Sequence, residues 1–294
     1  MILAIGEVLM EFRRRDDDGS LVTPGEWAGP FASGAPAIFA SVAARLGAPV
    51  GLAGGVGDDS FGRAILDRLR RDGVRPFGLN MIRARSTAVA FVAYEPSGGR
   101  DFWFSVRDSA AIEVDPAAVQ RAARDADWLH VSGSTLGFGG PLAAAVESAA
   151  AAVLRNGGRL SLDPNLRPDA PGKTRERTVE LARQAHVLFP SEGELAALDL
   201  AEGDLLESGA LICHTRGRAG AVLSGAAVGG RDVAVPAHEV QEVDATGAGD
   251  TFAAAFVTAL RDGAAPVAAA ELACATAALC VSTLGAMEAP VRPG

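Results

Sequence analysis

Lysine is almost absent from this sequence. Lys173 is the only lysine, although 27 residues are basic. A mechanism that needs a Schiff-base lysine or a phosphate-binding P-loop lysine therefore depends on one position. Lys173 stands between a glycine and a threonine, as a P-loop lysine does, but Arg167 occupies the place of the motif's first glycine. We therefore expect Lys173 to be a solvated loop residue.

Cysteines and long apolar runs are also scarce. Cys213, Cys274 and Cys280 are spaced for neither a disulfide framework nor a zinc site. The N-terminus lacks a basic leader, so we expect no signal peptide and a reducing, cytoplasmic compartment. No apolar run approaches the ~20 residues of a membrane span. The net charge of −9 disfavours nucleic-acid or acidic-membrane partners.

What the sequence has in quantity is apolar residues, 49% of the 294, enough for a large core. Strand and helix signals alternate along most of the chain, which predicts βαβ units. We expect an α/β fold: a three-layer, doubly wound, mostly parallel sheet with helices on both faces. The predicted strands are 2–6, 50–53, 128–131, 159–162, 187–189 and 211–214, with a hairpin of 221–223 and 233–235. The predicted helices are 36–46, 60–71, one opening at 115–116, 141–155, 174–184, 192–198, 246–260 and 266–283.

Residues 13–32 and 87–107 interrupt this alternation, because both are strand-like and neither contains a helix. In the second stretch Val89, Phe91 and Ala93 alternate with residues that are also apolar, so both faces of the strand are apolar. Such a strand outside the main sheet needs a cover, either a ligand or another subunit. The alternative is an ordinary addition to the edge of the main sheet. The simplest layout is one domain, 1–294, with these two segments inserted as a small β appendage.

Small residues at 247–249 lead directly into a helix with Phe252 and Phe256 on its buried side. Without bulky side chains, an anion can approach the free N–H groups of the first turn, at the positive end of the helix dipole. Asp250 would repel that anion, so its presence indicates a further role. Accepting the proton of an attacking hydroxyl during phosphoryl transfer is such a role. The alternative is a glycine-rich helix start in which Asp250 merely favours the dipole.

Residues 244–252 resemble the D-T-T-G-A-G-D-x-F signature of the ribokinase-like (PfkB) carbohydrate kinases, with Ala245 in place of one threonine. The D-x-N-x-R element that resembles fructokinase and 2-keto-3-deoxygluconate kinase members lies at 163–167. The resemblance spans nearly the whole chain and implies an ATP-dependent sugar kinase with a ribokinase-like fold. The other matching segments, in family order, are 6–11 (opening strand), 33–37 (sugar-side glycine motif), 54–62 (G-x-V-G-D-D-x-F-G), 191–194 (N-x-x-E) and 215–220 (T-x-G-x-x-G).

The resemblance implies a role for each matching residue. Asp250 is the expected catalytic base, and the amides of Gly247, Ala248 and Gly249 are the expected anion hole for the γ-phosphoryl group. Glu194 is expected to hold the magnesium of Mg-ATP through water. Residues expected along the nucleotide and phosphates are Asn165, Thr215, Gly217, Gly220 and Thr246. Residues expected at the sugar are Glu11, Gly34, Ala35, Arg107 and Arg167.

The resemblance also implies that 13–32 and 87–107 form a lid, which closes over the sugar and excludes water. A homodimer through this lid and a monovalent cation such as K⁺ near Asp244 are further implications. Four positions depart from the family's pattern. Ile38, Ser191 and Thr276 stand where the family has asparagines, and Glu11 stands where it has aspartate. Losing a hydrogen bond to a sugar hydroxyl costs on the order of 1 kcal/mol, so we expect Ile38 to alter sugar preference rather than abolish transfer.

Arg107 follows the aromatic residues 102–104, where acidic-sugar members place an arginine. With Arg167 it would pair a substrate carboxylate bidentately, which favours 2-keto-3-deoxygluconate over fructose. The alternative is that Arg107 pairs with Asp108 or Asp101 on the lid surface and Arg167 meets only phosphate, which leaves a neutral hexose such as fructose.

Two rival functions belong to other classes. An NAD-dependent oxidoreductase needs G-x-G-x-x-G after the first strand, and the residues after Gly6 offer none. A catalytically weak sugar-binding or regulatory protein on the kinase fold is favoured by Ile38 and disfavoured by Asp250, since a binder has no use for a base beside a phosphate site.

Overall fold

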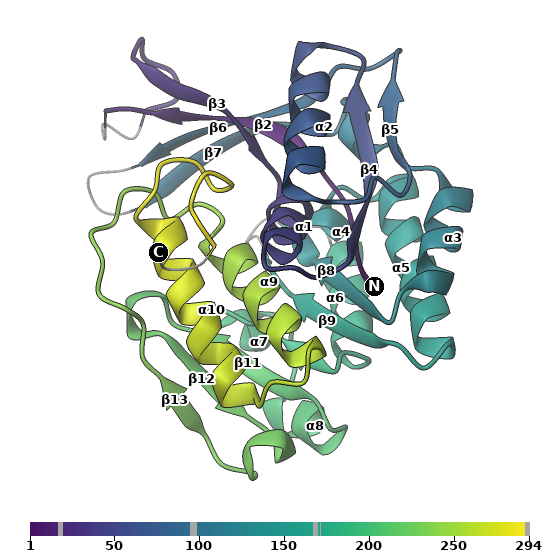
Figure 1. Ribbon diagram of the computed structural model, residues 1–294, viewed down its shortest axis with the longest axis vertical. Helices are drawn as coiled ribbons and strands as arrows, with labels where there is room; N and C mark the ends of the chain where they lie inside the picture. Colours follow the sequence, from purple (N-terminus) through teal and green to yellow (C-terminus); the bar gives the residue numbers. More distant parts are fainter. Residues whose placement is uncertain (17–19, 95–98, 167–169, 171, 292–294) are drawn as a thin grey trace.

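The computed structural model describes residues 1–16, 20–94, 99–166, 170 and 172–291. Its main sheet is built from β1 (Ile2–Ile5), β4 (Val50–Gly57), β5 (Leu79–Ile82), β8 (Trp128–Ser132), β9 (Arg159–Asp163), β10 (Val187–Leu188), β11 (Leu211–Thr215), β12 (Ala221–Ser224) and β13 (Val233–Val235). These nine strands lie in the order β13-β12-β11-β10-β9-β8-β1-β4-β5 (Figure 1). Strands from β11 to β5 run parallel, and β12 and β13 add the expected antiparallel hairpin at one edge.

Helices cover both faces of this sheet (Figure 1). One face packs against α1 (Ala35–Arg45), α2 (Ser60–Asp72), α9 (Ala248–Arg261) and α10 (Pro266–Val281). The other packs against α3 (Pro116–Asp125), α4 (Gly133–Gly137), α5 (Gly140–Arg155), α6 (Gly172–Ala182), α7 (Glu194–Ala197) and α8 (Glu202–Glu207). The residues of strand β1 are all apolar because both faces of the strand are buried. Ile2 and Ala4 pack in the core on one face of the sheet, and Leu3 and Ile5 pack in the core on the other. The three-layer, mostly parallel α/β architecture is confirmed.

A second sheet of four strands has the order β3-β2-β6-β7. Its strands are β2 (Leu9–Arg14), β3 (Trp27–Ser33), β6 (Ala88–Tyr94) and β7 (Arg100–Ser105). Among the described residues no strand pairing joins it to the main sheet, so the alternative of an edge addition is wrong. The sheet begins at Leu9, before the predicted 13–32 segment, because the chain turns after β1 and pairs Leu9–Arg13 with β6.

The two faces of the second sheet are apolar in different ways. Leu9, Ala88 and Ala90 belong to a small buried cluster on one face. On the other, the ring of Phe91 stacks on Phe12 at 5.2 Å and packs edge-on against Trp27 at 5.1 Å. The two-sided apolarity of 88–93 therefore has a structural cause in addition to any ligand.

Several elements differ from the sequence prediction. Strand β5 was not predicted, because Leu-Asn-Met-Ile is a half-exposed edge strand with no clear apolar period. Helix α8 was not predicted either, since the six residues Glu202–Glu207 bury only Leu205. Helix α9 begins at Ala248 rather than 246, because Gly247 has the left-handed φ of 78° and caps the helix. Helix α7 is shorter than the predicted 192–198 for a similar reason: Gly193 is left-handed, with φ 79°.

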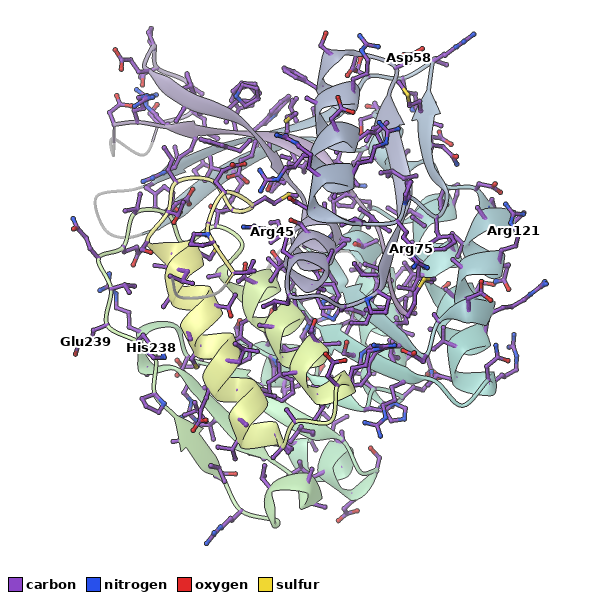
Figure 2. All side chains as sticks on the ribbon, viewed as in Figure 1. Arg45, Asp58, Arg75, Arg121, His238 and Glu239 are labelled. Carbon is purple, nitrogen blue, oxygen red and sulfur yellow. The ribbon has the colours of Figure 1, made fainter. Side chains whose placement is uncertain are left out.

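Three remaining features bear on function. In the described part of the chain, no helix is both long and apolar enough to cross a membrane. The three cysteines are free and buried. The exposed His238 lies beside Glu239 on the outer connection between β13 and α9 (Figure 2). The described residues hold no cluster of three or more side chains that could bind a metal ion.

Candidate active site

Polar residues gather where the parallel strands end. Glu7 follows β1 by two residues, Ser132 and Asp163 end β8 and β9, and Thr215 ends β11. Ligands of open α/β sheets bind at this carboxyl edge. The first turn of α9 meets the same edge, because a β-carbon on Gly249 would lie 3.7 Å from Asp163 Oδ2.

The glycine-rich start of α9 leaves little room around its backbone on the inner side. A β-carbon on Gly247 would lie 2.7 Å from the Cβ of Ala286 and 3.1 Å from the Cδ1 of Ile38. On the outer side Gly249 is exposed, so an anion can reach this turn from solvent. The amide of Ala248 makes a long bond of 3.3 Å to the carbonyl of Ala245. Ile38 is only 2% exposed and supports the turn from below.

Asp250 lies on this first turn and is half-buried. Burial raises the pKa of Asp250 to about 7, and the negative charge of Glu7 acts in the same direction. A carboxylate with a pKa near the working pH is well suited to accept and release a proton. Asp250 is thus only half-buried, and its pKa near 7 is compatible with a general base.

Glu7 is buried and held in place by hydroxyl groups. Ser134 Oγ donates to Glu7 Oε1 at 2.8 Å, and Thr135 Oγ1 donates to Oε2 at 2.6 Å. Ser134 is in turn 2.9 Å from the hydroxyl of Ser132, which accepts a 3.4 Å bond from the side-chain amide of Asn165. This network connects the neighbour of Asp250 to the D-x-N-x-R element.

Asp163 and Glu194 add two more carboxylates. Burial raises the pKa of Asp163 well above its usual range, and the charges of Asp250 and Glu194 raise it further, while the amide of Asn165 opposes the shift. Glu194 Oε1 accepts from the amide of Leu166 and Oε2 from that of Ser191, both at 2.7 Å. Oxygen donors and concentrated negative charge are the environment that a magnesium ion prefers.

The predicted nucleotide loop lies beside Glu194. Thr215 pairs with Ser191 through a parallel bridge, and their hydroxyls are 3.5 Å apart. The chain then turns through Gly217, with φ 53°, to Gly220, with φ 86°. At Gly220 a β-carbon would lie 2.1 Å from the carbonyl oxygen of Val235, so only glycine fits. Thr215, Gly217 and Gly220 are thus brought to the same edge as Glu194 and Asn165.

The residues predicted to bind the sugar differ in burial and in position. Glu11, buried on β2, accepts a 3.0 Å bond from Ser33 Oγ. Gly34 packs tightly on the backbone of Glu7, since a β-carbon there would lie 2.5 Å from the Glu7 carbonyl oxygen, and Ala35 begins α1. Arg107 is exposed in the turn after β7. Arg167 lies outside the described residues, so its predicted pairing with Arg107 stays a prediction.

Comparison with known proteins decides the class of this site. Residues 1–292 match the model of the pfkB family carbohydrate kinases. The chain belongs to the pfkB family of carbohydrate kinases. A fructokinase of Klebsiella pneumoniae is 34% identical over 240 residues, which cover 77% of this chain and 76% of that protein. A putative ribokinase II from E. coli, solved with ATP and Mg²⁺, has a TM-score of 0.89 and 33% identity, and the match covers 98% of this chain and 95% of that one.

A further solved relative of this pfkB kinase carries a sugar. A double mutant of the fructokinase from Vibrio cholerae, bound to fructose, ADP and potassium, has a TM-score of 0.83 and 26% identity. That match covers 98% of this chain and 94% of that one.

Three residues of this pfkB kinase were given no role at the sequence level, although two of them, Glu7 and Asp163, lie in the matching segments 6–11 and 163–167. Glu7 and Asp163 both come directly after or at the end of an aliphatic strand, and that position was a usable signal. Tyr94 contacts Asp244 across 150 residues of sequence, and no local pattern indicates that contact.

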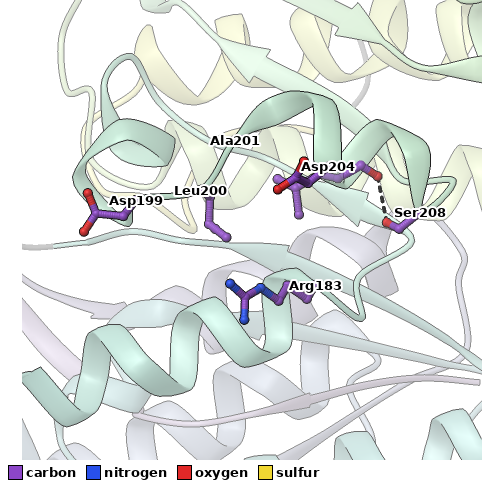
Figure 3. Close-up of a pocket in the computed structure, with 7 residues that line it drawn as sticks. Arg183, Asp199, Leu200, Ala201, Asp204 and Ser208 are labelled. Atoms are coloured by element: carbon purple, nitrogen blue, oxygen red, sulfur yellow. Dashed lines mark hydrogen bonds between the residues drawn. The ribbon is translucent and has the colours of Figure 1, made fainter.

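Asp250 does not line either of two surface cavities of the pfkB kinase. One, of about 270 Å³, is lined by residues of the loop around α7 together with Glu202 and His214. The other, of about 200 Å³, lies between α6 and α8 (Figure 3) and is lined by Arg183, Asp199, Leu200, Ala201, Asp204, Leu205 and Ser208. Neither includes a residue predicted for catalysis or sugar binding.

Proposed function

We propose that this kinase transfers the γ-phosphoryl group of ATP to a primary hydroxyl of fructose or a closely similar neutral sugar. The observation that carries the proposal is Asp250 on the first turn of α9, where burial and the charge of Glu7 raise its pKa to about 7. A base at a helix N-terminus is suited to a reaction in which an alcohol loses a proton beside a negatively charged phosphoryl group. Relatives named fructokinase support the substrate class.

In the proposed mechanism Asp250 accepts the proton of the attacking hydroxyl. The amides at Gly247, Ala248 and Gly249 stabilise the charge on the transferred group, since they are fixed before the reaction begins. The charge of Glu7, which is held in place by Ser134 and Thr135, adds to the effect of burial and raises the pKa of Asp250 to about 7. The protein's contribution is thus positioning and electrostatics, as phosphoryl transfer requires.

The donor groups fit Mg-ATP. Glu194 already accepts two backbone N–H bonds, which suits an indirect hold on magnesium through water. The turn of Thr215, Gly217 and Gly220 and the side chains of Asn165 and Thr246 would line the nucleotide. Mg-ATP, when bound, supplies the phosphoryl group.

A monovalent cation is also proposed near Asp244. Cys280 Sγ lies 3.5 Å from the carbonyl oxygen of Thr246 and 3.7 Å from that of Ala286, so these carbonyls and the buried Asp244 carboxylate lie close together. Carbonyl and carboxylate oxygens can replace the hydration shell of K⁺.

The second sheet is proposed as a lid. Strand β3 ends at Ser33, directly before Gly34, and a closed sheet there would keep water from the transferred group. The layout as one domain, 1–294, with lid segments 13–32 and 87–107, is part of this proposal. A homodimer through the lid and a cytoplasmic location stay predictions.

As the sugar substrate, we favour fructose over 2-keto-3-deoxygluconate. Arg107, which was expected to bind the carboxylate of the acid, is exposed, and its expected partner Arg167 lies outside the described residues. The relatives, by contrast, are named fructokinases. Phosphorylation of 2-keto-3-deoxygluconate is therefore only one of the outcomes that a substrate panel distinguishes.

A substrate panel tests the proposed function. ADP release is measured with fructose, ribose, glucose and 2-keto-3-deoxygluconate, each with and without ATP and Mg²⁺, and the phosphorylated carbon is identified by ³¹P–¹H NMR. We expect the highest kcat/KM with fructose. No sugar-dependent ADP release with any member would contradict the kinase mechanism, and a higher kcat/KM for the keto acid would overturn the sugar assignment alone.

A further inference from the structure

Tyr94, the only tyrosine of the chain, reaches from the second sheet to the loop 243–246. Its hydroxyl donates to Asp244 Oδ1 at 2.7 Å and accepts from the amide of Ala245 at 3.2 Å. Asp244 is 1% exposed and also accepts from the amides of Thr246 at 3.0 Å and Gly285 at 3.1 Å. One phenol of β6 thus contacts both a buried carboxylate and a backbone amide of the loop.

Arg13 on β2 contacts both the Tyr94 ring and the same loop. Its guanidinium carbon lies 4.4 Å from the centroid of the Tyr94 ring, and its Nη1 donates to the carbonyl of Val243 at 2.5 Å. A guanidinium over an aromatic face is attracted to the ring and limits its motion. Two neighbouring strands of the second sheet therefore hold the loop at adjacent residues.

The loop 243–246 leads directly into the glycine-rich turn of α9. On its other side the carbonyl of Val281, at the end of α10, accepts from the amides of Val243 at 2.8 Å and Asp244 at 3.0 Å. The turn itself has only small side chains, so its place depends on how the loop before it is anchored. The loop is anchored on one side by α10 and on the other by the second sheet.

We propose that Tyr94 is a positioning residue that couples the second sheet to the amides of Gly247–Gly249. When the sheet lies over the site, the phenol fixes Asp244 and Ala245, and this sets the place of the anion-binding turn. The proposal rests on the proposed role of those amides. Amides that must be aimed at developing charge affect the transition state more than the ground state, so loss of the phenol is expected to lower kcat and leave KM for the sugar nearly unchanged.

The first test compares Tyr94→Phe with Phe91→Leu, a change on the same strand whose ring faces Phe12 and Trp27 rather than the loop. We expect Y94F to lower kcat by about tenfold or more, since it removes a hydrogen bond to a charged group, with KM for fructose within about twofold. We expect F91L to lower Tm with kcat within about twofold. Equal kcat in Y94F and the unsubstituted enzyme, or an equal loss of kcat in F91L, would overturn the positioning role.

The second test needs no substitution at Tyr94. Replacing tyrosine with 3-fluorotyrosine gives a single ¹⁹F resonance, because the sequence has one tyrosine. We expect this resonance to shift in Asp244→Asn, whose charge contacts the phenol, and to stay in place in Asp250→Asn. An unshifted resonance in D244N would overturn the proposal. A shifted resonance in D244N together with full activity in D250N would instead contradict the proposed function and leave the Tyr94 contact established.

Discussion

The side chain of Ile38 lies against the backbone of Gly247, where an added β-carbon would come within 3.1 Å of its Cδ1. Ile38 is 2% exposed and lies in the core beside the glycine-rich turn 247–249. This burial gives the isoleucine a packing role, supporting the turn. The altered sugar preference expected from Ile38 would therefore have to act indirectly, through the turn.

This contact makes Gly247→Ala a sharp test of the turn. Alanine meets both the left-handed φ of 78° and the 2.7 Å approach to Ala286, so the turn must shift. We expect kcat to fall by about 100-fold, the loss typical of a damaged oxyanion-type site. Steady-state ADP release measures it. Gly263→Ala is the matched control, because Gly263 has φ 93° with nothing within 4 Å of an added β-carbon. It should lower Tm and leave kcat nearly unchanged. Equal kcat in both variants would remove the turn from the mechanism.

The pH profile should report Asp250. Only the deprotonated carboxylate can accept a proton, so kcat/KM, which reports the free enzyme, should fall as the pH drops below about 7, the pKa of Asp250. Glu7→Gln removes the neighbouring charge that raises this pKa. The acidic limb of the profile should then move by about one unit to lower pH. An acidic limb that moves to higher pH, or does not move, would show that the charge of Glu7 does not raise the pKa of Asp250.

Magnesium dependence should depend on Glu194. Glu194→Gln keeps the side-chain shape but loses the charge, so the half-saturating Mg²⁺ concentration should rise by about tenfold. Titration of activity with Mg²⁺ at fixed ATP measures this. Glu192→Gln is the control, since Glu192 is exposed two residues away. An identical rise in both variants would mean a general surface-charge effect.

The role of Arg107 can be separated from general lid effects. Because Arg107 is exposed in the turn after β7, Arg107→Ala should leave KM for fructose within about twofold. Arg83→Ala, at a side chain that is 92% exposed, serves as the control. If 2-keto-3-deoxygluconate is a good substrate and R107A alone raises its KM by about tenfold, Arg107 binds a substrate carboxylate after all.

The sequence predicted what is encoded locally. The aliphatic run 2–6 predicted a buried strand, and the small residues before Phe252 predicted a helix start open to an anion. What it could not predict depends on tertiary structure. Strand β5 is an edge strand whose pairing with β4, not its composition, makes it a strand. The contact between Tyr94 and Asp244 joins the second sheet to the loop before α9 through a single hydroxyl, and no periodicity encodes it.

Asp250→Asn tests the central claim most directly. The substitution keeps the size of the side chain and removes its ability to accept a proton, so fructose-dependent ADP release should fall by about 100-fold or more while the ¹⁹F resonance of Tyr94 and the Tm show a folded enzyme. Activity within about tenfold of the unsubstituted enzyme would contradict the account, because the proton would then leave by a route that does not involve Asp250.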